Sequence, residues 1–178
     1  DGIYVLLKEV VDNAVDEFIM GAGDKIVVKI ENGTVSVRDR GRGIPLGKVV
    51  ECVSVINTGA KYSDDVFQFS VGLNGVGTKA VNALSSGFRV VSYREGRYVE
   101  AVFEQGVLKS QKEGSSGREP TGTLVEFSPD PEVFGDFSYN MEYVEKRMKH
   151  YAYLNSGLTL LLNGEEFSSH SGLLDLLK

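Results

Sequence analysis

The pattern that most constrains the fold is a series of alternating strands joined by two-residue turns. Residues 25–31 and 34–39 alternate apolar and polar side chains around Asn32-Gly33, a pair that favours the positive φ angles of a tight hairpin. Similar turn signals separate three further predicted strands: 88–94, 97–104 and 107–112, punctuated by Glu95-Gly96 and Gln105-Gly106. Hairpins of this kind join antiparallel strands. The sequence therefore predicts a largely antiparallel sheet.

Helices are interleaved with these hairpins without strict βαβ alternation. Apolar residues at helical spacing predict a first helix from Ile3 to about Met20, ended by Gly21-Ala22-Gly23. The other predicted elements are helices at 48–57, 78–86 and 140–155, strands at 123–128 and 158–162, and loops at 58–77 and 113–122. We expect an α+β fold with a mixed, mostly antiparallel sheet and helices on one face. Without a repeat or a linker, residues 1–178 are expected to form a single domain.

Composition excludes several classes of protein. The 178 residues carry a net charge of −6 and no basic run, which argues against nucleic-acid binding by this domain alone. One cysteine, Cys52, rules out an internal disulfide and fits a reducing, cytoplasmic setting; its valine neighbours place it in the core. Two separated histidines argue against a zinc cluster. The sequence has no apolar run of the roughly 20 residues that a membrane span needs.

The first helix carries an unusual polar stripe. Glu9, Asn13 and Asp16 fall within about 60° of one another around the helix axis, with Glu17 at the border. A solvated face is one interpretation, but the segment Glu9–Glu17 (EVVDNAVDE) has no base to pair with its four acids. A carboxylate and an amide oxygen one turn apart would also suit Mg²⁺, or would let one group hold metal while the other activates water.

Asp39-Arg40-Gly41-Arg42-Gly43-Ile44-Pro45 leaves the second hairpin strand. This composition is good material for a plain turn. Alternatively, Asp39 at a strand end would accept a hydrogen bond from an amino group, and the glycines would let a flat ligand lie close to the backbone. The two interpretations stay open on this motif alone.

Gly72-Leu73-Asn74-Gly75-Val76-Gly77 runs directly into the helix predicted from Thr78. Glycines before a helix leave backbone N–H groups free to bind an anion such as phosphate. The order of glycines matches neither a P-loop, which requires a following Lys-Ser/Thr, nor the dinucleotide-binding fingerprint G-x-G-x-x-G. A glycine-rich loop without a ligand remains the alternative.

In this order, the three motifs resemble those of the GHKL ATPases. Within that superfamily, the chain closely resembles the ATPase domains of bacterial type IIA topoisomerases, the B subunits of gyrase and topoisomerase IV. The resemblance rests on EVVDNAVDE (9–17), VSVRDRGRGIP (35–45), TGAKY (58–62), SVGLNGVGTKAVNALS (70–85), YREG (93–96), TGTLVEF (121–127) and LNSG (154–157). It implies the two-layer α/β sandwich known as the Bergerat fold.

The resemblance also implies a role for each motif residue. Glu9 would be the general base that activates the attacking water, and Asn13 would ligate Mg²⁺. Asp39 would accept from the adenine amino group with support from Thr123, and Glu17 would pair with Arg42 at the pocket wall. The remaining implied nucleotide contacts are Gly41, Gly43, Ile44 and Pro45 along the pocket floor, Lys61, Gly72, Leu73, Asn74, Gly75, Val76 and Gly77 at the phosphates, and Arg94 at the mouth; Asp16 would support them.

The partners implied are ATP with Mg²⁺, a second copy of the same polypeptide, a DNA-cleaving A-type partner chain, and inhibitors that compete for the ATP site. DNA would be contacted through other domains, and its topology changed by the whole enzyme. Because the sequence opens inside a helix, we expect a fragment without the N-terminal arm and transducer domain of the family. Such a fragment would stay monomeric and would bind ATP but hydrolyse it poorly.

Two alternatives remain at this point. One is another GHKL branch, namely Hsp90, MutL or a histidine kinase; the other is a nucleotide-sensing module in which Glu9 is only structural. Arg40, Val71 and Asn74 depart from the commonest family pattern and favour the topoisomerase IV form over gyrase. The sequence does not decide between those two enzymes.

Overall fold

The computed structural model describes residues 2–55, 76–170 and 172. The apolar stripe of the first predicted helix is buried along α1 (Gly2–Ile19), where Leu6, Leu7, Val10 and Val11 are each at most 4% exposed. The helix ends at Ile19 because Gly21 and Gly23 follow with φ angles of +87° and +80°.

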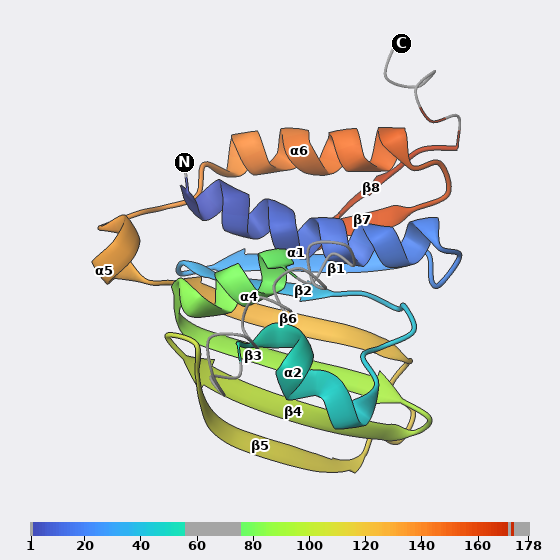
Figure 1. Cartoon of the computed structure of the whole chain (residues 1–178). Helices are drawn as coiled ribbons and strands as arrows, with labels where there is room; N and C mark the ends of the chain where they lie inside the picture. The colour runs from blue at the N-terminus through green and yellow to red at the C-terminus, as the bar shows by residue number, and fades with distance from the viewer. Residues whose placement is uncertain (1, 56–75, 171, 173–178) are drawn as a thin grey trace.

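All the described strands belong to one eight-stranded sheet with the order β5-β4-β3-β6-β2-β1-β7-β8 (Figure 1). The strands are β1 (Lys25–Glu31), β2 (Thr34–Arg38), β3 (Ser85–Arg94), β4 (Arg97–Glu104), β5 (Val107–Ser115), β6 (Gly122–Pro129), β7 (Thr159–Leu162) and β8 (Glu165–Ser168). β1 pairs with β7 in parallel, and the other neighbouring strands pair antiparallel. The expected mixed, mostly antiparallel sheet is confirmed.

The predicted hairpin turns are present. Asn32 and Gly33 have φ angles of +52° and +79°, and both residues of the pairs Glu95-Gly96 and Gln105-Gly106 also have positive φ angles. Positive φ at both positions matches the right-handed twist of the strands that the turn joins. A fourth such turn, Asn163-Gly164, joins β7 to β8.

The helices gather on one face of the sheet, as expected (Figure 1). Those after α1 are α2 (Val49–Val53), α4 (Val76–Ala83), α5 (Pro131–Phe134) and α6 (Met141–Leu154). α1 packs on β1, β2 and β6, α2 and α4 on β3 and β4, and α6 on β7 and β8. Phe88, Phe103 and Phe127 are among the largest side chains buried between the two layers. The fold is a two-layer α/β sandwich.

Some predicted elements have different bounds. The helix predicted at 48–57 is a short 3₁₀ turn, η1 (Leu46–Lys48), followed by α2, and the helix predicted to reach Ser86 ends at Ala83. Two short elements, α5 and β8, were not predicted. β8 lies at the edge of the sheet, and its sequence, EEFS, does not alternate apolar and polar residues. The pattern that usually predicts a strand is therefore missing.

Two further expectations need comment. The prediction that Cys52 lies in the core is wrong, because its side chain is exposed while Val49 and Val53 on the same helix are buried. Within the described residues, no helix is long and apolar enough to cross a membrane.

Candidate functional site

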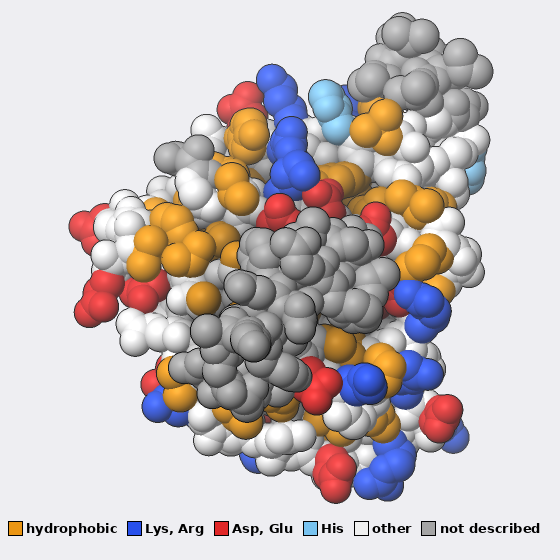
Figure 2. Space-filling model, in the orientation of Figure 1, with side chains coloured by type: hydrophobic (Ala, Val, Ile, Leu, Met, Phe, Trp, Pro, Cys, Tyr) orange, Lys and Arg blue, Asp and Glu red, His pale blue; other side chains and the backbone are white. Residues whose placement is uncertain are grey.

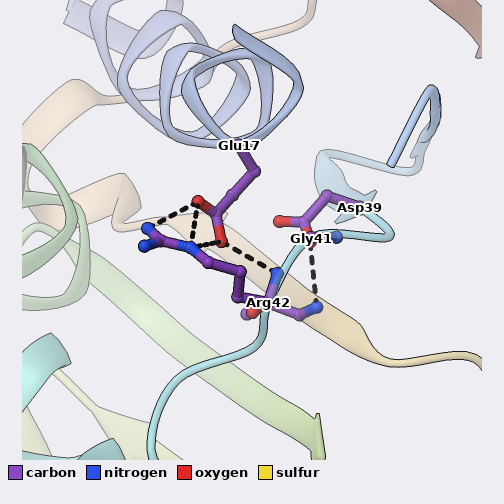
Figure 3. A network of polar contacts seen from close by, with 5 residues as sticks. Glu17, Asp39, Gly41 and Arg42 are labelled. Carbon is purple, nitrogen blue, oxygen red and sulfur yellow. Dashed lines mark hydrogen bonds and ion pairs between the residues drawn. The ribbon is translucent and has the colours of Figure 1, made fainter. Parts of the chain in front are cut away.

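Asp39 lies directly after β2, only 9% exposed, between the chain segments of β2 and β6. Its Oδ1 accepts hydrogen bonds from the backbone N–H groups of Gly41, at 2.9 Å, and Thr123, at 3.1 Å. The Asp39 N–H in turn donates to the Thr123 carbonyl at 2.9 Å. Among the described residues, the Gly41 and Thr123 N–H groups both donate to Oδ1 of Asp39 (Figure 3). The other oxygen, Oδ2, can therefore accept a hydrogen bond from a ligand.

Burial raises the pKa of Asp39 to about 6, although the two backbone N–H groups act in the opposite direction. Desolvation disfavours the charged carboxylate. At neutral pH, the Asp39 carboxylate is therefore a hydrogen-bond acceptor, and the burial of its charge costs the folded protein free energy.

Glu17 on α1 holds the loop that follows Asp39 (Figure 3). Its Oε1 accepts from the backbone N–H of Arg42 at 3.0 Å, and its Oε2 lies 2.9 Å from Arg42 Nη2. A Cβ atom added at Gly41 would lie 2.6 Å from Glu17 Cγ. The loop can therefore approach α1 this closely only with glycine at position 41.

The same loop is fixed to β3 by Ser92, a fully buried residue. Its Oγ donates to the Ile44 carbonyl at 2.6 Å and accepts from the Ile44 N–H at 2.8 Å. Gly43 has a φ of +75°, and a Cβ there would lie 2.7 Å from Arg94 Cγ. These contacts place Gly43, Ile44 and Arg94 beside one another.

Replacing Ser92 with alanine is expected to destabilise the protein by about 1–3 kcal/mol, because both Ile44 backbone groups lose a partner in a largely buried place. Urea unfolding measures this loss. Ser86→Ala is the matched control, since Ser86 is exposed and its hydroxyl bond to the Ser128 carbonyl is long, at 3.3 Å. Equal losses in the two variants would contradict the role given to Ser92.

Glu9 and Asn13 face the first turn of α4. The Asn13 Nδ2 donates to the Thr78 hydroxyl, and a Cβ added at Gly77 would lie 2.1 Å from Glu9 Oε2. The first N–H groups of a helix lack partners within the helix and carry partial positive charge, so a carboxylate is favourable there. With its Nδ2 used by Thr78, Asn13 keeps Oδ1 for a cation.

Asp12, between these residues in sequence, faces α6 instead. It accepts from the Tyr151 hydroxyl and from Lys8 Nζ, at 2.6 Å in each case. Asp12, one of the four acids in the segment 9–17, is thus bonded to Tyr151 and Lys8. The helix presents Glu9, Asn13 and Glu17 to the other side, over two turns.

The structure thus brings most of the described site residues into two connected groups along α1. Glu9, Asn13, Gly77 and Thr78 form one group; Glu17, Asp39, Gly41, Arg42, Gly43, Ile44, Arg94 and Thr123 form the other. Pro45 follows Ile44 and accepts from the Lys48 N–H at 2.8 Å. Val76 opens α4, while Lys61, Gly72, Leu73, Asn74 and Gly75 lie outside the described residues.

Thr78 and Ser92 were not singled out from the sequence. Ser92 had a signal, because it is a polar residue within the otherwise apolar stretch VVSY of a strand. In the described part of the chain, no group of three or more His, Cys, Asp or Glu side chains could hold a metal ion. A cation bound beside Asn13 would therefore need further oxygen ligands from a small molecule bound together with it.

Comparison with known proteins places these residues in context. The family model for histidine kinase-, DNA gyrase B- and HSP90-like ATPases matches residues 1–132. The B subunit of DNA topoisomerase 4 from Borreliella burgdorferi is 60% identical over 177 residues, which are 99% of this chain and 29% of that protein. The B subunit of DNA gyrase from Thermus thermophilus is 37% identical over 98% of this chain and 29% of its own length.

A solved structure agrees with these matches. The 43K ATPase domain of Thermus thermophilus gyrase B, in complex with an aminocoumarin, superimposes with a TM-score of 0.76 at 34% identity. The match covers 96% of this chain and 47% of that one. The chain spans less than a third of the length of each of the two curated relatives named above.

Proposed function

Because the chain belongs to the family of histidine kinase-, DNA gyrase B- and HSP90-like ATPases, we propose that residues 1–178 form the ATP-binding domain in the B subunit of a bacterial type II topoisomerase. The two curated relatives named above are proteins of this kind, one from topoisomerase IV and one from gyrase. ATP binding and hydrolysis in the whole enzyme would drive dimerisation and the passage of one DNA segment through another.

The observation that carries the proposal is the buried carboxylate of Asp39, with one oxygen held by two backbone N–H groups and the other able to accept. The amino group of adenine is a donor that fits such an acceptor. Guanine has a carbonyl oxygen at the corresponding ring position, and two acceptors facing each other repel. The geometry of Asp39 therefore favours ATP over GTP.

The loop around the adenine would be shaped by its contacts to α1 and β3. Glu17 holds the Arg42 backbone and guanidinium, and Ser92 holds Ile44. Gly41, Gly43 and Pro45 would then form the wall and floor, and Thr123 would support Asp39. Arg94 beside Gly43 would stand at the mouth, where an ATP-site inhibitor such as an aminocoumarin would contact it.

At the phosphate end, Asn13 fits a magnesium ligand because its Oδ1 is a hard oxygen not used in the bond to Thr78. Mg²⁺ there would neutralise phosphate charge. Glu9, held against Gly77, would orient the attacking water and take its proton. Lys61, Gly72, Leu73, Asn74, Gly75 and Val76 are proposed to bind the phosphates, with Asp16 supporting the magnesium side.

In the intact protein, a second copy of this polypeptide and a DNA-cleaving A-type chain would complete the enzyme, and its work on DNA would place it in the cytoplasm. The 60% identity to a protein of topoisomerase 4 supports the topoisomerase IV form. Histidine kinases and HSP90-like proteins share the family model. The alternative of a nucleotide-sensing module without catalysis differs from the proposal only in the role of Glu9.

The direct test is a thermal unfolding experiment with Mg-ATP. A ligand that binds only the folded protein stabilises it by about 2.7 kcal/mol at a concentration 100 times its dissociation constant, which is roughly 5–10 °C for a chain of this size. Mg-GTP is the control and is expected to give a much smaller shift. Equal shifts with the two nucleotides would contradict the adenine contact at Asp39.

A further inference from the structure

Arg38 is the last residue of β2 and directly precedes Asp39. Side chains alternate between the two faces of a strand, and Val35 and Val37 of β2 are buried in the core beneath the helices. Arg38 therefore points to the other face of the sheet, which the described helices do not cover (Figure 1). Figure 2 shows the molecule from the helix side. Arg38 thus approaches Asp39 from behind the proposed ATP site.

The guanidinium group of Arg38 joins two segments of backbone. Its Nη1 donates to the carbonyl of Asp39, and its Nη2 donates to the carbonyl of Pro120 and, at 3.1 Å, to Glu119 Oε1. Its Cζ lies 4.5 Å from the centroid of the Tyr93 ring on β3. With these partners the Arg38 side chain is only 16% exposed, although it lies on the uncovered face. Arg38 therefore connects the end of β2 to the segment that leads into β6.

This connection restricts the backbone of Asp39. The Asp39 N–H donates to the Thr123 carbonyl at 2.9 Å, and the Asp39 carbonyl accepts from Arg38. A Cβ atom added at Gly122, where φ is +147°, would lie 2.2 Å from that carbonyl oxygen. β6 can therefore come this close to Asp39 only with glycine at position 122. The close approach brings the Thr123 N–H within 3.1 Å of Asp39 Oδ1, and the direction of the free Oδ2 follows from it.

Arg38 also acts on the charge of Asp39. Burial raises the pKa of Asp39 to about 6, against the opposing effect of two backbone N–H groups. Of the nearby charges, Glu17 on α1 raises this pKa and Arg38 lowers it. Arg42 in the following loop is paired with Glu17, and β6 presents the uncharged Thr123. Among the described residues, Arg38 is thus the cation that favours the ionised form of Asp39.

We propose that Arg38 is a positioning residue for the adenine contact, acting through Asp39 from the face of the sheet opposite the nucleotide. This inference rests on the proposed function, because it concerns the same site. Two separable effects follow from the chemistry of the side chain. The forked donors fix the geometry of Asp39, and the positive charge extends the pH range in which Asp39 is an ionised acceptor. Lysine would keep the charge but not the fork.

The test measures the dissociation constant of Mg-ATP by isothermal titration from about pH 5.5 to about pH 8.5, on either side of the pKa of Asp39. Arg38→Gln removes both the fork and the charge, whereas Arg38→Lys removes the fork alone. The matched control is Arg89→Gln, because Arg89 lies on the same face of β3 as Tyr93 and pairs with Glu100 at 2.8 Å. The ratio of each variant to the wild type at one pH cancels the titration of the nucleotide itself.

At about pH 8.5 we expect both Arg38 variants to bind Mg-ATP roughly tenfold more weakly than the wild type, because the forked hydrogen bonds are lost. Protonation of Asp39 turns the acceptor into a donor facing the adenine amino group, so affinity falls as the pH is lowered. In Arg38→Gln this fall should begin at a higher pH than in the wild type, since loss of the nearby cation favours the protonated form. Arg38→Lys should keep the wild-type pH dependence, and Arg89→Gln should match the wild type throughout.

A ratio of Arg38→Gln to wild type that is constant with pH would overturn the proposal, because a merely structural role predicts that result. Equal changes in Arg89→Gln would also overturn it. If urea unfolding shows that Arg38→Gln does not fold, Arg38→Lys decides at about pH 8.5, where wild-type affinity would contradict the role of the fork. A wild type that does not bind Mg-ATP would overturn the proposed function as well, whereas unaffected variants of a binding wild type count against Arg38 alone.

Discussion

Replacing Asp39 with asparagine is expected to abolish the stabilisation by Mg-ATP and, at the same time, to make the ligand-free protein more stable at neutral pH. The asparagine oxygen can still accept from Gly41 and Thr123, so the loop keeps its position. The outward atom then becomes an N–H donor facing the adenine amino group, which is also a donor. Isothermal titration with Mg-ATP and urea unfolding measure the two effects.

The gain in stability follows from the pKa of Asp39, raised from 3.8 to about 6 by burial. Below pH 3.8 the carboxyl is protonated in both the folded and the unfolded states, so its burial carries no charge penalty. As the pH rises from 3.8 to about 6, the unfolded state loses its proton first, and folding loses up to about 3 kcal/mol. Asparagine has no such dependence.

The difference in unfolding free energy between Asp39→Asn and the wild type should therefore be small near pH 4 and largest above pH 7. Glu126→Gln is a suitable control, since Glu126 is a half-buried carboxylate on the neighbouring strand β6. If Asp39→Asn still binds Mg-ATP as tightly as the wild type, then Asp39 does not contact the adenine. A variant less stable than the wild type at pH 7 would contradict the burial penalty.

Replacing Glu9 with glutamine in the full-length protein is expected to lower ATP hydrolysis about 10²–10⁴-fold while ATP still binds. A positioned general base contributes this much to a proton transfer, and the amide has nearly the same shape without the basicity. Steady-state hydrolysis together with the Mg-ATP thermal shift separates chemistry from binding.

Asp12→Asn is the matched control for Glu9→Gln. Both carboxylates lie on α1, but Asp12 contacts Lys8 and Tyr151 towards α6, whereas Glu9 contacts Gly77 at α4. The control should lose stability and keep most of its catalytic rate. Hydrolysis by Glu9→Gln at the wild-type rate would leave the nucleotide-sensing module as the better description.

The regular elements were largely predictable from local signals. The bounds of α1, the hairpin turn at Asn32-Gly33 and the strand β4 agree with the predictions to within a residue or two. These features follow from apolar periodicity and from residues that tolerate positive φ, which act over a few neighbouring positions. β8 and the exposure of Cys52 were missed, because a short edge strand and the orientation of a short helix depend on what packs beside them.

The candidate site divides in the same way. Glu9, Asn13, Glu17, Asp39 and Arg42 were named from motifs, and their roles with the nucleotide stay predictions. The contacts of Ser92 and Thr78 were not foreseen, since each joins segments more than 40 residues apart in sequence.

By itself, the sequence determined which groups are available: the acids and amide of α1, the carboxylate after β2, and the glycines that permit close approach. Only the tertiary structure decided their electrostatic setting. Burial between β2 and β6 turns Asp39 into a costly acceptor, and the antiparallel register sets Arg94 opposite Arg97 on an acidic chain. Desolvation and Coulomb energies depend on distance and surroundings in space, which the order of residues along a chain does not contain.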